Sequence, residues 1–193
     1  MSKYFSDLGI NEQLLKGLAD LKISVPTDIQ EKTIPLVLNQ TEDLVAVAKT
    51  GTGKTAAFGI PLLQLIDTDN TNVQVVILAP TRELGQQIHS NLVSYASQSS
   101  SISVAAVCGG IAIKPQIERL KTPTHIVVAT PGRLVDLVKR SALNIKTIAY
   151  LVLDEADEMV SALKQDLDLI IKAIPKTRRT LLFTATLSGA IKQ

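Results

Sequence analysis

A loop rich in glycine, lysine and threonine follows an apolar run in this sequence, and its residue types suit the binding of phosphate. Residues 44–48 predict a buried strand, and Gly-Lys-Thr at 53–55 predicts the start of a helix. Small residues let a backbone wrap around an anion, and helix N-terminal amides point at its negative charge. Lys54 would then reach the outer phosphates, and the Thr55 hydroxyl would bind a magnesium ion. The alternative is a chance match in a loop of this composition; the candidate residues are Lys49, Thr50, Gly51, Thr52, Gly53, Lys54 and Thr55.

Two acidic residues follow a later apolar run, which predicts another strand at 150–153. Asp154 would hold magnesium opposite Thr55, partly through water, because magnesium keeps several of its water ligands. Glu155 could polarise an attacking water as a general base. Lys54, Asp154 and Glu155 would then form the catalytic set of a phosphoryl-transfer site. The alternative is a solvated acidic loop or helix start, where carboxylates favour the positive end of the helix dipole.

Short apolar runs that alternate with longer amphipathic stretches must position these residues. The runs predict strands at 44–48, 73–79, 102–107, 125–129, 150–153 and 180–183, and the stretches predict helices at about 54–66, 82–96, 113–121, 132–140 and 166–174. Such alternation implies right-handed crossovers and a mainly parallel sheet with helices on both faces. Residues 1–40 predict a helical segment packed on the core. We therefore expect an α/β fold in which residues 41–193 form the main domain.

Composition narrows the class of protein. The chain has 193 residues, of which 46% are hydrophobic and 20% charged, which is typical of a globular protein and not of a disordered one. A net charge of +2 neither favours nor excludes nucleic acid as a partner. The single cysteine, Cys108, excludes an internal disulfide and is interpreted as a packed residue in a reducing compartment. No signal core or membrane-length run is present, so we expect a cytoplasmic protein with no membrane partner.

Further polar residues follow the other predicted strands, at the edge where an open parallel sheet binds its ligands. Hydroxyls, helix N-termini and arginines can contact a sugar-phosphate backbone without reading bases. The alternative is helix capping by the threonines and ion pairs of the arginines with Glu83 or Asp136, and the residues alone favour it. The residues in question are Thr81, Arg82, Gly109, Gly110, Thr130, Gly132 and Arg133.

The N-terminal segment contains two residues that could contact a base. The Gln30 amide carries both a donor and an acceptor, which would suit an adenine edge. It could equally complete a capping box with Thr27, and the two roles can hold together. Phe5 precedes the first predicted helix and could simply pack against it.

Taken together, these motifs resemble the DEAD-box family of ATP-dependent RNA helicases, and specifically their first, RecA-like core domain. Asp154-Glu155-Ala156-Asp157 matches the motif that names the family, and residues 48–55 resemble its nucleotide loop. Phe5 and the stretch 26–30 look like the adenine-reading Q motif. The resemblance covers essentially the whole chain, and the remaining motifs follow in the family's order: Pro80-Thr81-Arg82-Glu83-Leu84, Gly109-Gly110, Thr130-Pro131-Gly132-Arg133 and Thr184-Ala185-Thr186.

The resemblance implies an enzyme with ATP and Mg²⁺ as cofactors and single-stranded RNA as a partner, bound through its backbone without sequence specificity. It implies that Gln30 reads adenine and that Phe5 stacks on the base. It implies that the polar residues at the strand ends bind RNA, in place of the capping role that the residues alone favour. It also implies that Thr184 and Thr186 contact Asp157 and couple the nucleotide state to RNA separation.

The sequence also departs from the family. Lys22 and Ile23 stand where the family usually has glycine and an aromatic residue, so we expect the adenine grip to rest on Gln30 and Phe5. No second RecA-like domain follows in these 193 residues, and with it the arginine-rich motif that would complete the ATP site is missing. We interpret the chain as part of a longer, monomeric helicase. Alone it should bind adenine nucleotides weakly, turn over negligibly and unwind nothing.

Two other functions stay open at this point. One is a nucleotide-dependent module that binds RNA or protein and never hydrolyses ATP; the presence of Glu155 argues against it. The other is a kinase, which would use the same phosphate loop. A kinase would leave Arg82, Arg133 and Thr184 without a role.

Overall fold

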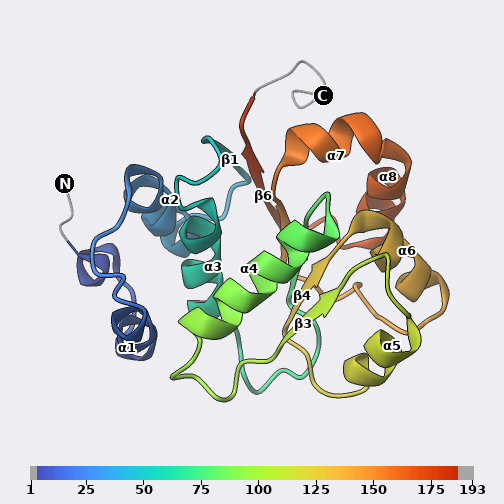
Figure 1. The fold of residues 1–193 in the computed structure, drawn as a ribbon, viewed down its shortest axis with the longest axis horizontal. Coiled ribbons are helices and arrows are strands. Elements are labelled where there is room, and N and C mark those ends of the chain that lie inside the picture. Colours follow the sequence, from blue (N-terminus) through green and yellow to red (C-terminus); the bar gives the residue numbers. More distant parts are fainter. Residues whose placement is uncertain (1–3, 187–193) are drawn as a thin grey trace.

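A six-stranded parallel sheet forms the centre of the computed structural model, which describes residues 4–186 (Figure 1). All strand pairs are parallel, so the carboxyl ends of the strands lie along one edge. Side chains that follow the strands are thereby brought to the same edge, as expected for an open α/β sheet. In spatial order the strands are β1 (Leu44–Val47), β6 (Arg179–Thr184), β5 (Tyr150–Leu153), β2 (Val75–Leu78), β4 (Ile126–Ala129) and β3 (Val104–Val107).

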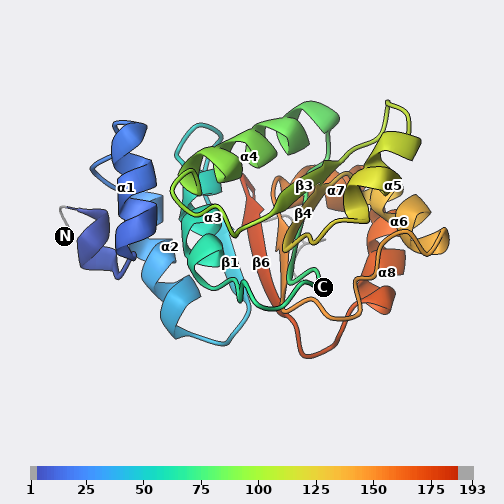
Figure 2. The ribbon, with the colours of Figure 1, turned by 90° about the horizontal axis from the view of Figure 1, so that it is seen from below.

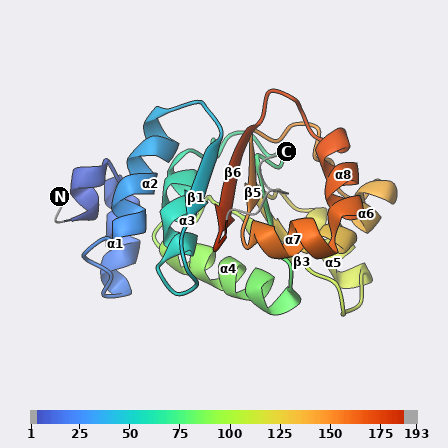
Figure 3. The same cartoon turned by 90° about the horizontal axis from the view of Figure 1, so that it is seen from above.

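Helices cover both faces of the sheet because the inner strands are apolar on both sides. Along β2, Val75 and Ile77 join one hydrophobic cluster, whereas Val76 and Leu78 join the other. The views from below and above (Figures 2 and 3) show α1 (Glu12–Asp20) and α2 (Asp28–Asn39) at one end of the molecule and α6 (Pro131–Lys139) and α8 (Lys164–Ala173) at the other. The helices of the core are α3 (Lys54–Gln64), α4 (Arg82–Tyr95), α5 (Lys114–Leu120), α6 (Pro131–Lys139), α7 (Ala156–Ala162) and α8 (Lys164–Ala173).

The N-terminal segment packs on the face that carries α3 and α4. It consists of a 3₁₀-helix, η1 (Phe5–Leu8), followed by α1 (Glu12–Asp20) and α2 (Asp28–Asn39). The Gln64 side chain of α3 accepts from the Asn11 amide at 2.7 Å and donates to the Gly9 carbonyl at 2.9 Å. A Cβ atom on Gly17 would lie 2.4 Å from the Tyr95 carbonyl oxygen, so only glycine allows α1 to approach α4 this closely.

The predicted α/β fold is confirmed, and each predicted strand is present with ends shifted by at most a few residues. One helix was not predicted: α7 starts immediately after Glu155, in a stretch whose acidic residues also suit a loop. Cys108 is fully buried, as predicted, and burial raises the pKa of its thiol. None of the helices in residues 4–186 combines the length and apolar character that a bilayer crossing requires.

Candidate functional site

The loop between β1 and α3 takes its shape from two glycines. Gly51 and Gly53 have φ angles of +83° and +92°, a region that side chains with a Cβ atom rarely adopt. A Cβ atom on Gly53 would also lie 2.3 Å from the side-chain Nε2 of Gln30. Helix α3 begins at Lys54, so its first amides have no partner within the helix and face the loop. The start of α3 therefore offers N–H donors that an anion in the loop could accept.

Lys54 and Asp154 are buried together at this edge of the sheet. The Lys54 Nζ lies 3.8 Å from the Asp154 Oδ1, and only 6% and 3% of the two side chains are exposed. Among the described residues, Nζ has no hydrogen-bond partner. Because an unsatisfied buried donor costs about 1–3 kcal/mol, and more when charged, such an ammonium is suited to an anionic ligand that supplies the missing acceptors.

The carboxyl groups beside this lysine have perturbed acidities. Burial raises the pKa of Asp154 to about 6, although the Lys54 ammonium acts in the opposite direction. Burial also raises the pKa of Glu155, with a further contribution from the Glu158 carboxylate. Glu155 has a φ of +55°, and its amide donates to the Asp154 Oδ1 at 3.1 Å. Strained backbone and shifted pKa values together are typical of residues that handle protons at an active site.

A cavity of about 340 Å³ joins the loop to the two acidic residues. Thr55 and Asp154 both line it, so a hydroxyl and a carboxylate are available to the same ion. No group of three or more histidine, cysteine, aspartate or glutamate side chains in residues 4–186 could hold a metal alone. This small set of oxygen ligands suits Mg²⁺, which binds through one or two protein groups, water and substrate phosphates.

Helix α4 contributes part of the cavity wall that the sequence analysis missed. Gln87, Asn91 and Tyr95 line the cavity together with Leu84. Their spacing of four residues places them on one face of a helix. This spacing is the sequence signal that could have identified them, because it brings the polar residues Gln87 and Asn91 onto the helix face that lines the cavity.

Gln30 performs the capping role and also touches the loop. Its side-chain oxygen accepts from the Thr27 amide at 2.9 Å, completing the predicted capping box. Its nitrogen donates to the Gly53 carbonyl at 3.1 Å, while the Thr27 hydroxyl donates to the Thr52 carbonyl at 2.9 Å. An amide has two donor hydrogens and two lone pairs, so one of each is left for a ligand. Gln30 also lines the cavity, where adenine recognition remains a prediction.

The structure places Phe5 differently from the arrangement that the resemblance implied. Its side chain is 2% exposed and belongs to the hydrophobic cluster formed with the N-terminal helices. It is absent from the residues that line the cavity. In this structure Phe5 therefore packs in the core and is not open to stack on a base. The physical reason is the large apolar area that an aromatic ring removes from water.

Most of the predicted RNA-binding residues lie together beyond β2, β3 and β4. The Thr130 hydroxyl accepts from the Gly109 amide at 3.0 Å. The Arg133 Nη2 donates to the Ile111 carbonyl at 2.8 Å, while its Nη1 is buried without a partner among the described residues. A Cβ atom on Gly110 would lie 3.9 Å from the Arg82 Nη1, so Arg82 borders the same loop. Two guanidinium groups thus flank a glycine-rich backbone segment.

The capping alternative explains only part of this cluster. The Thr81 hydroxyl accepts from the Leu84 amide at 3.2 Å and caps α4. The expected arginine–carboxylate pairs are not formed within residues 4–186, because Asp136 pairs instead with Arg140 at 2.6 Å. Gly132 lies at the exposed start of α6, where a Cβ atom would approach the Asp166 carboxylate at 3.2 Å. Within residues 4–186, neither Arg82 nor Arg133 therefore forms an ion pair with a carboxylate.

Asp157 is linked to the end of β6. The Thr186 hydroxyl donates to the Asp157 Oδ2 at 2.9 Å, and the Thr184 hydroxyl donates to the Thr186 carbonyl at 2.8 Å. Burial raises the pKa of Asp157, but hydrogen bonds from the Thr186 and Thr184 side chains outweigh it and bring the pKa below its usual value. The structure therefore brings the three predicted coupling residues together.

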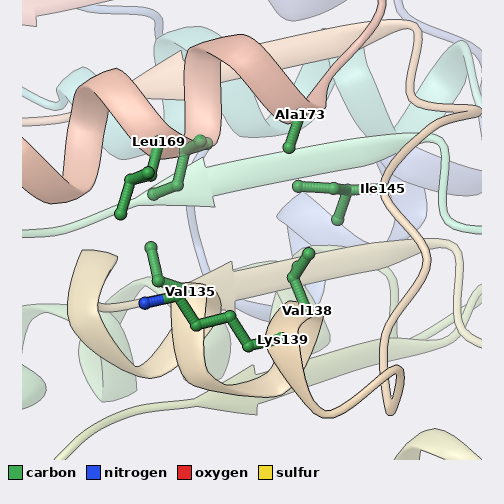
Figure 4. Close-up of a pocket in the computed structure, with 7 residues that line it drawn as sticks. Val135, Val138, Lys139, Ile145, Leu169 and Ala173 are labelled. Carbon is green, nitrogen blue, oxygen red and sulfur yellow. The ribbon is translucent and has the colours of Figure 1, made fainter.

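A second hollow lies far from these residues and has no comparable chemistry. Figure 4 shows it between α6 and α8, lined by aliphatic side chains that include Val135, Val138 and Leu169. Its volume is about 130 Å³. Its lining is aliphatic apart from Lys139, so it contains no carboxylate, hydroxyl or glycine-rich loop to bind a metal or wrap a phosphate, and the candidate site remains at the carboxyl edge of the sheet.

The parallel sheet, the two-glycine loop and the buried lysine–aspartate pair define a RecA-like α/β domain of the class that binds nucleoside triphosphates. The chain belongs to the DEAD/DEAH box helicase family, whose family model matches residues 27–193. It is 45% identical over 190 residues to the DEAD-box ATP-dependent RNA helicase CshA of Streptococcus pneumoniae, covering 98% of this chain and 36% of that protein. It is 42% identical over 188 residues to a probable ATP-dependent RNA helicase of Methanocaldococcus jannaschii, covering 97% and 50%.

Solved structures agree with this assignment. A crystal structure of a DEAD box protein from the hyperthermophile Methanococcus jannaschii matches with a TM-score of 0.92 at 41% identity, covering 98% of this chain and 52% of that one. Yeast Dbp5 bound to RNA and ADP BeF3 matches with a TM-score of 0.89 at 31% identity, covering 100% and 49%. The chain thus spans about a third to a half of the length of these relatives.

Proposed function

We propose that this chain is the first core domain of an ATP-dependent RNA helicase and binds Mg-ATP and single-stranded RNA along one edge of its sheet. Residues 1–40 serve as the Q-motif segment, and residues 41–193 form the ATP-binding core. The observation that carries the proposal is the Lys54 ammonium, which is buried 3.8 Å from Asp154 and has no hydrogen-bond partner in the described chain. A phosphate in the adjoining loop would provide the acceptors that this ammonium lacks.

The residues around the cavity divide the chemistry among them. Lys54 and the loop amides hold the outer phosphates, while Thr55 and Asp154 provide the oxygen ligands for Mg²⁺. Bound Mg²⁺ would neutralise negative charge on the phosphates. Glu155 orients the attacking water and accepts its proton, a role that its raised pKa supports. Gln30 positions the base through the donor and acceptor that its contacts with Thr27 and Gly53 leave free.

RNA would lie across the loops that follow β2, β3 and β4. Arg82 and Arg133 supply positive charge, and Thr81, Thr130 and the backbone at Gly109, Gly110 and Gly132 supply polar contacts. No aromatic residue belongs to this set, so stacking on bases has no platform and binding depends on the backbone. The structure of yeast Dbp5 with RNA and ADP BeF3 supports the proposal, because its domain has the same fold.

Hydrolysis and unwinding would require a second RecA-like domain. No arginine lines the cavity among the described residues, so the developing charge on the transferred phosphoryl group lacks an arginine partner. Such partners contribute about 10³–10⁵ in rate in related phosphoryl-transfer enzymes. We therefore expect the 193-residue chain to bind adenine nucleotides weakly and to hydrolyse almost none. The lone, buried cysteine is consistent with a reducing cytoplasm.

Replacing the general base tests this proposal in the full-length protein. Glu155→Gln should lower RNA-stimulated ATP hydrolysis by at least about 100-fold, because general base catalysis contributes about 10²–10⁴ in rate. Binding of a fluorescent ADP analogue should be retained. Asp168→Asn, an exposed carboxylate on α8, is the matched control and should leave hydrolysis unchanged. Equal hydrolysis by Glu155→Gln and the wild type would contradict the helicase assignment.

A further inference from the structure

Arg179 carries a buried positive charge. It begins β6 and is 7% exposed, yet no ion pair involving it occurs within residues 4–186. Its Nε donates to the Glu42 carbonyl at 2.5 Å, its Nη1 to the Val37 carbonyl at 2.8 Å and its Nη2 to the Leu36 carbonyl at 3.1 Å. The guanidinium group is therefore satisfied by backbone alone.

Two of these carbonyls belong to the last turn of α2. The last carbonyls of a helix are short of partners within it, and the C-terminal end attracts positive charge. The Leu36 carbonyl also accepts from the Gln40 amide at 3.1 Å. Pro35 lies inside α2 and removes one backbone hydrogen bond just before this turn. Arg179 thus fastens the last turn of α2 to the first residue of β6. Figure 3 shows α2 and β6 on either side of β1.

The opposite ends of α2 and β6 both hold the phosphate loop. At the start of the loop, the Ala48 amide donates to the Thr184 carbonyl of β6 at 3.0 Å. At the end of the loop, two side chains from the start of α2 donate to loop carbonyls. The Thr27 hydroxyl donates to the Thr52 carbonyl at 2.9 Å, and the Gln30 Nε2 donates to the Gly53 carbonyl at 3.1 Å. The contacts therefore close a ring: Arg179 joins α2 to β6 at one end, and the loop joins them at the other.

We propose that Arg179 is a positioning residue for nucleotide binding: by fixing α2 to β6 it sets the separation of the two elements that hold the phosphate loop from either side. This rests on the proposed function, in which the loop binds ATP. Helix α2 has 12 residues and so spans about 18 Å. A tilt at its Arg179 end is carried to Gln30 at the other end, where hydrogen-bond geometry tolerates little displacement.

The direct test measures binding of mant-ADP to the 193-residue chain. Arg179→Met keeps much of the side-chain volume and removes all three hydrogen bonds, and it should raise the Kd roughly 5- to 30-fold, the upper range reported for couplings between distant groups. Arg179→Lys keeps the charge but not the fork of donors, and it should give an intermediate Kd. If Arg179→Met fails to fold, Arg179→Lys alone decides. A Kd unchanged from the wild type would overturn the proposal.

Two controls separate positioning from a general loss of stability. Arg178→Met removes the neighbouring guanidinium, whose one hydrogen bond within residues 4–186 goes to the Pro175 carbonyl at 3.0 Å and does not reach α2, and it should leave the Kd within about twofold. Leu143→Ala lies in the hydrophobic cluster on the other face and should destabilise the fold by about 2–5 kcal/mol without weakening nucleotide binding. Equal losses of affinity in Leu143→Ala and Arg179→Met would show a structural effect alone and would contradict the proposal.

Hydrogen exchange gives a readout that does not depend on the nucleotide. The Thr27 amide, at the far end of α2 from Arg179, is protected by its bond to the Gln30 side chain. Arg179→Met should speed its exchange more than Leu143→Ala does. If the wild-type chain bound no mant-ADP, the proposed function would fail, and this exchange rate would still decide the role of Arg179. Equal exchange in the two variants would refute it.

Discussion

The Lys54 Nζ lies 3.8 Å from the Asp154 Oδ1 in a part of the molecule almost closed to water. This separation is longer than a strong charge-assisted hydrogen bond, and Nζ finds no other partner in the described chain. Removing two charged groups from water is unfavourable for folding unless new hydrogen bonds and charge interactions replace their hydration in full. The pair therefore costs stability and keeps a lysine and a carboxylate available for ligands, a trade-off that is common at functional sites.

Asp154→Asn should change how stability depends on pH. The folded pKa of Asp154 is about 6, above its ordinary value of 3.8, so the folded state binds more protons between these values. The wild type therefore loses stability as pH rises from about 4 to 6, by roughly 3 kcal/mol in total. Relative to wild type, Asp154→Asn should gain about that much between pH 4 and pH 7.5. Urea unfolding at several pH values measures this change.

Leu143→Ala removes no titratable group, so its free energy of unfolding should differ from that of the wild type by the same amount at every pH. A pH-independent difference for Asp154→Asn as well would contradict the burial of this carboxyl.

Thr186→Val should raise the pKa of Asp157. The hydroxyl of Thr186 donates to the Asp157 Oδ2 at 2.9 Å and favours the ionised form, against the effect of burial. Carboxyl chemical shifts in an NMR titration of the 193-residue chain would measure the change. Thr186→Ser keeps the donor and should titrate like the wild type. In the full-length protein we expect Thr186→Val to retain ATP hydrolysis and lose unwinding; loss of both together would assign Thr186 to hydrolysis instead of coupling.

Arg82→Gln and Arg133→Gln should each weaken RNA binding by the full-length protein. For a given variant, the loss of affinity should be the same whatever the RNA sequence. Each substitution removes one positive charge from the group of residues that follows β2, β3 and β4. The slope of log affinity against log salt should therefore become less steep, by about 0.7 per lost phosphate contact. Arg133→Gln should have the larger effect, because Arg133 also holds the Ile111 carbonyl. Fluorescence anisotropy with oligo(U) and a mixed-sequence strand measures both quantities. Arg140→Gln is the control, since that arginine pairs with Asp136 on α6. A sequence-dependent loss would indicate base reading.

Gly17→Ala should destabilise the chain by about 1–3 kcal/mol through overpacking. The added Cβ atom would lie 2.4 Å from the Tyr95 carbonyl oxygen, and backbone cannot move aside as a side chain can. Urea unfolding measures the loss. The neighbouring Lys16→Ala should change stability by less than about 0.5 kcal/mol, because the Lys16 side chain is 66% exposed. Equal stability of Gly17→Ala and the wild type would show that α1 does not pack on α4 in solution.

Local patterns predicted the strands and the loop because their causes are local. Residues 75–78 form an uninterrupted apolar run, and in the structure all four are fully buried. The residue types at 51 and 53 predict a loop, and the positive φ angles of Gly51 and Gly53 explain why glycine stands there. Helix α3 starts at Lys54, within the Gly-Lys-Thr stretch where the sequence predicts a helix to begin.

Other features could not be read locally because two interactions competed for one residue. Gln30 could cap α2 or contact the loop, and the structure shows one side chain doing both. Phe5 could face a ligand or the core, and the apolar cluster of the N-terminal helices decided in favour of burial. Helix α7 has only seven residues and begins at a cluster of acids, so its sequence signal is weak.

The amino-acid sequence was enough to predict the fold class, the phosphate loop, the acidic pair at the end of β5 and the resemblance to the family. Each depends on residue types at fixed local spacing, which survive without knowledge of distant contacts. The folded chain was needed to show that β6 lies between β1 and β5, that Lys54 and Asp154 are buried with 3.8 Å between their charged groups, and that Arg179 binds the end of α2. These relationships join residues far apart in the chain, and they follow from how the whole sheet and its helices exclude water together, which no short window of sequence contains.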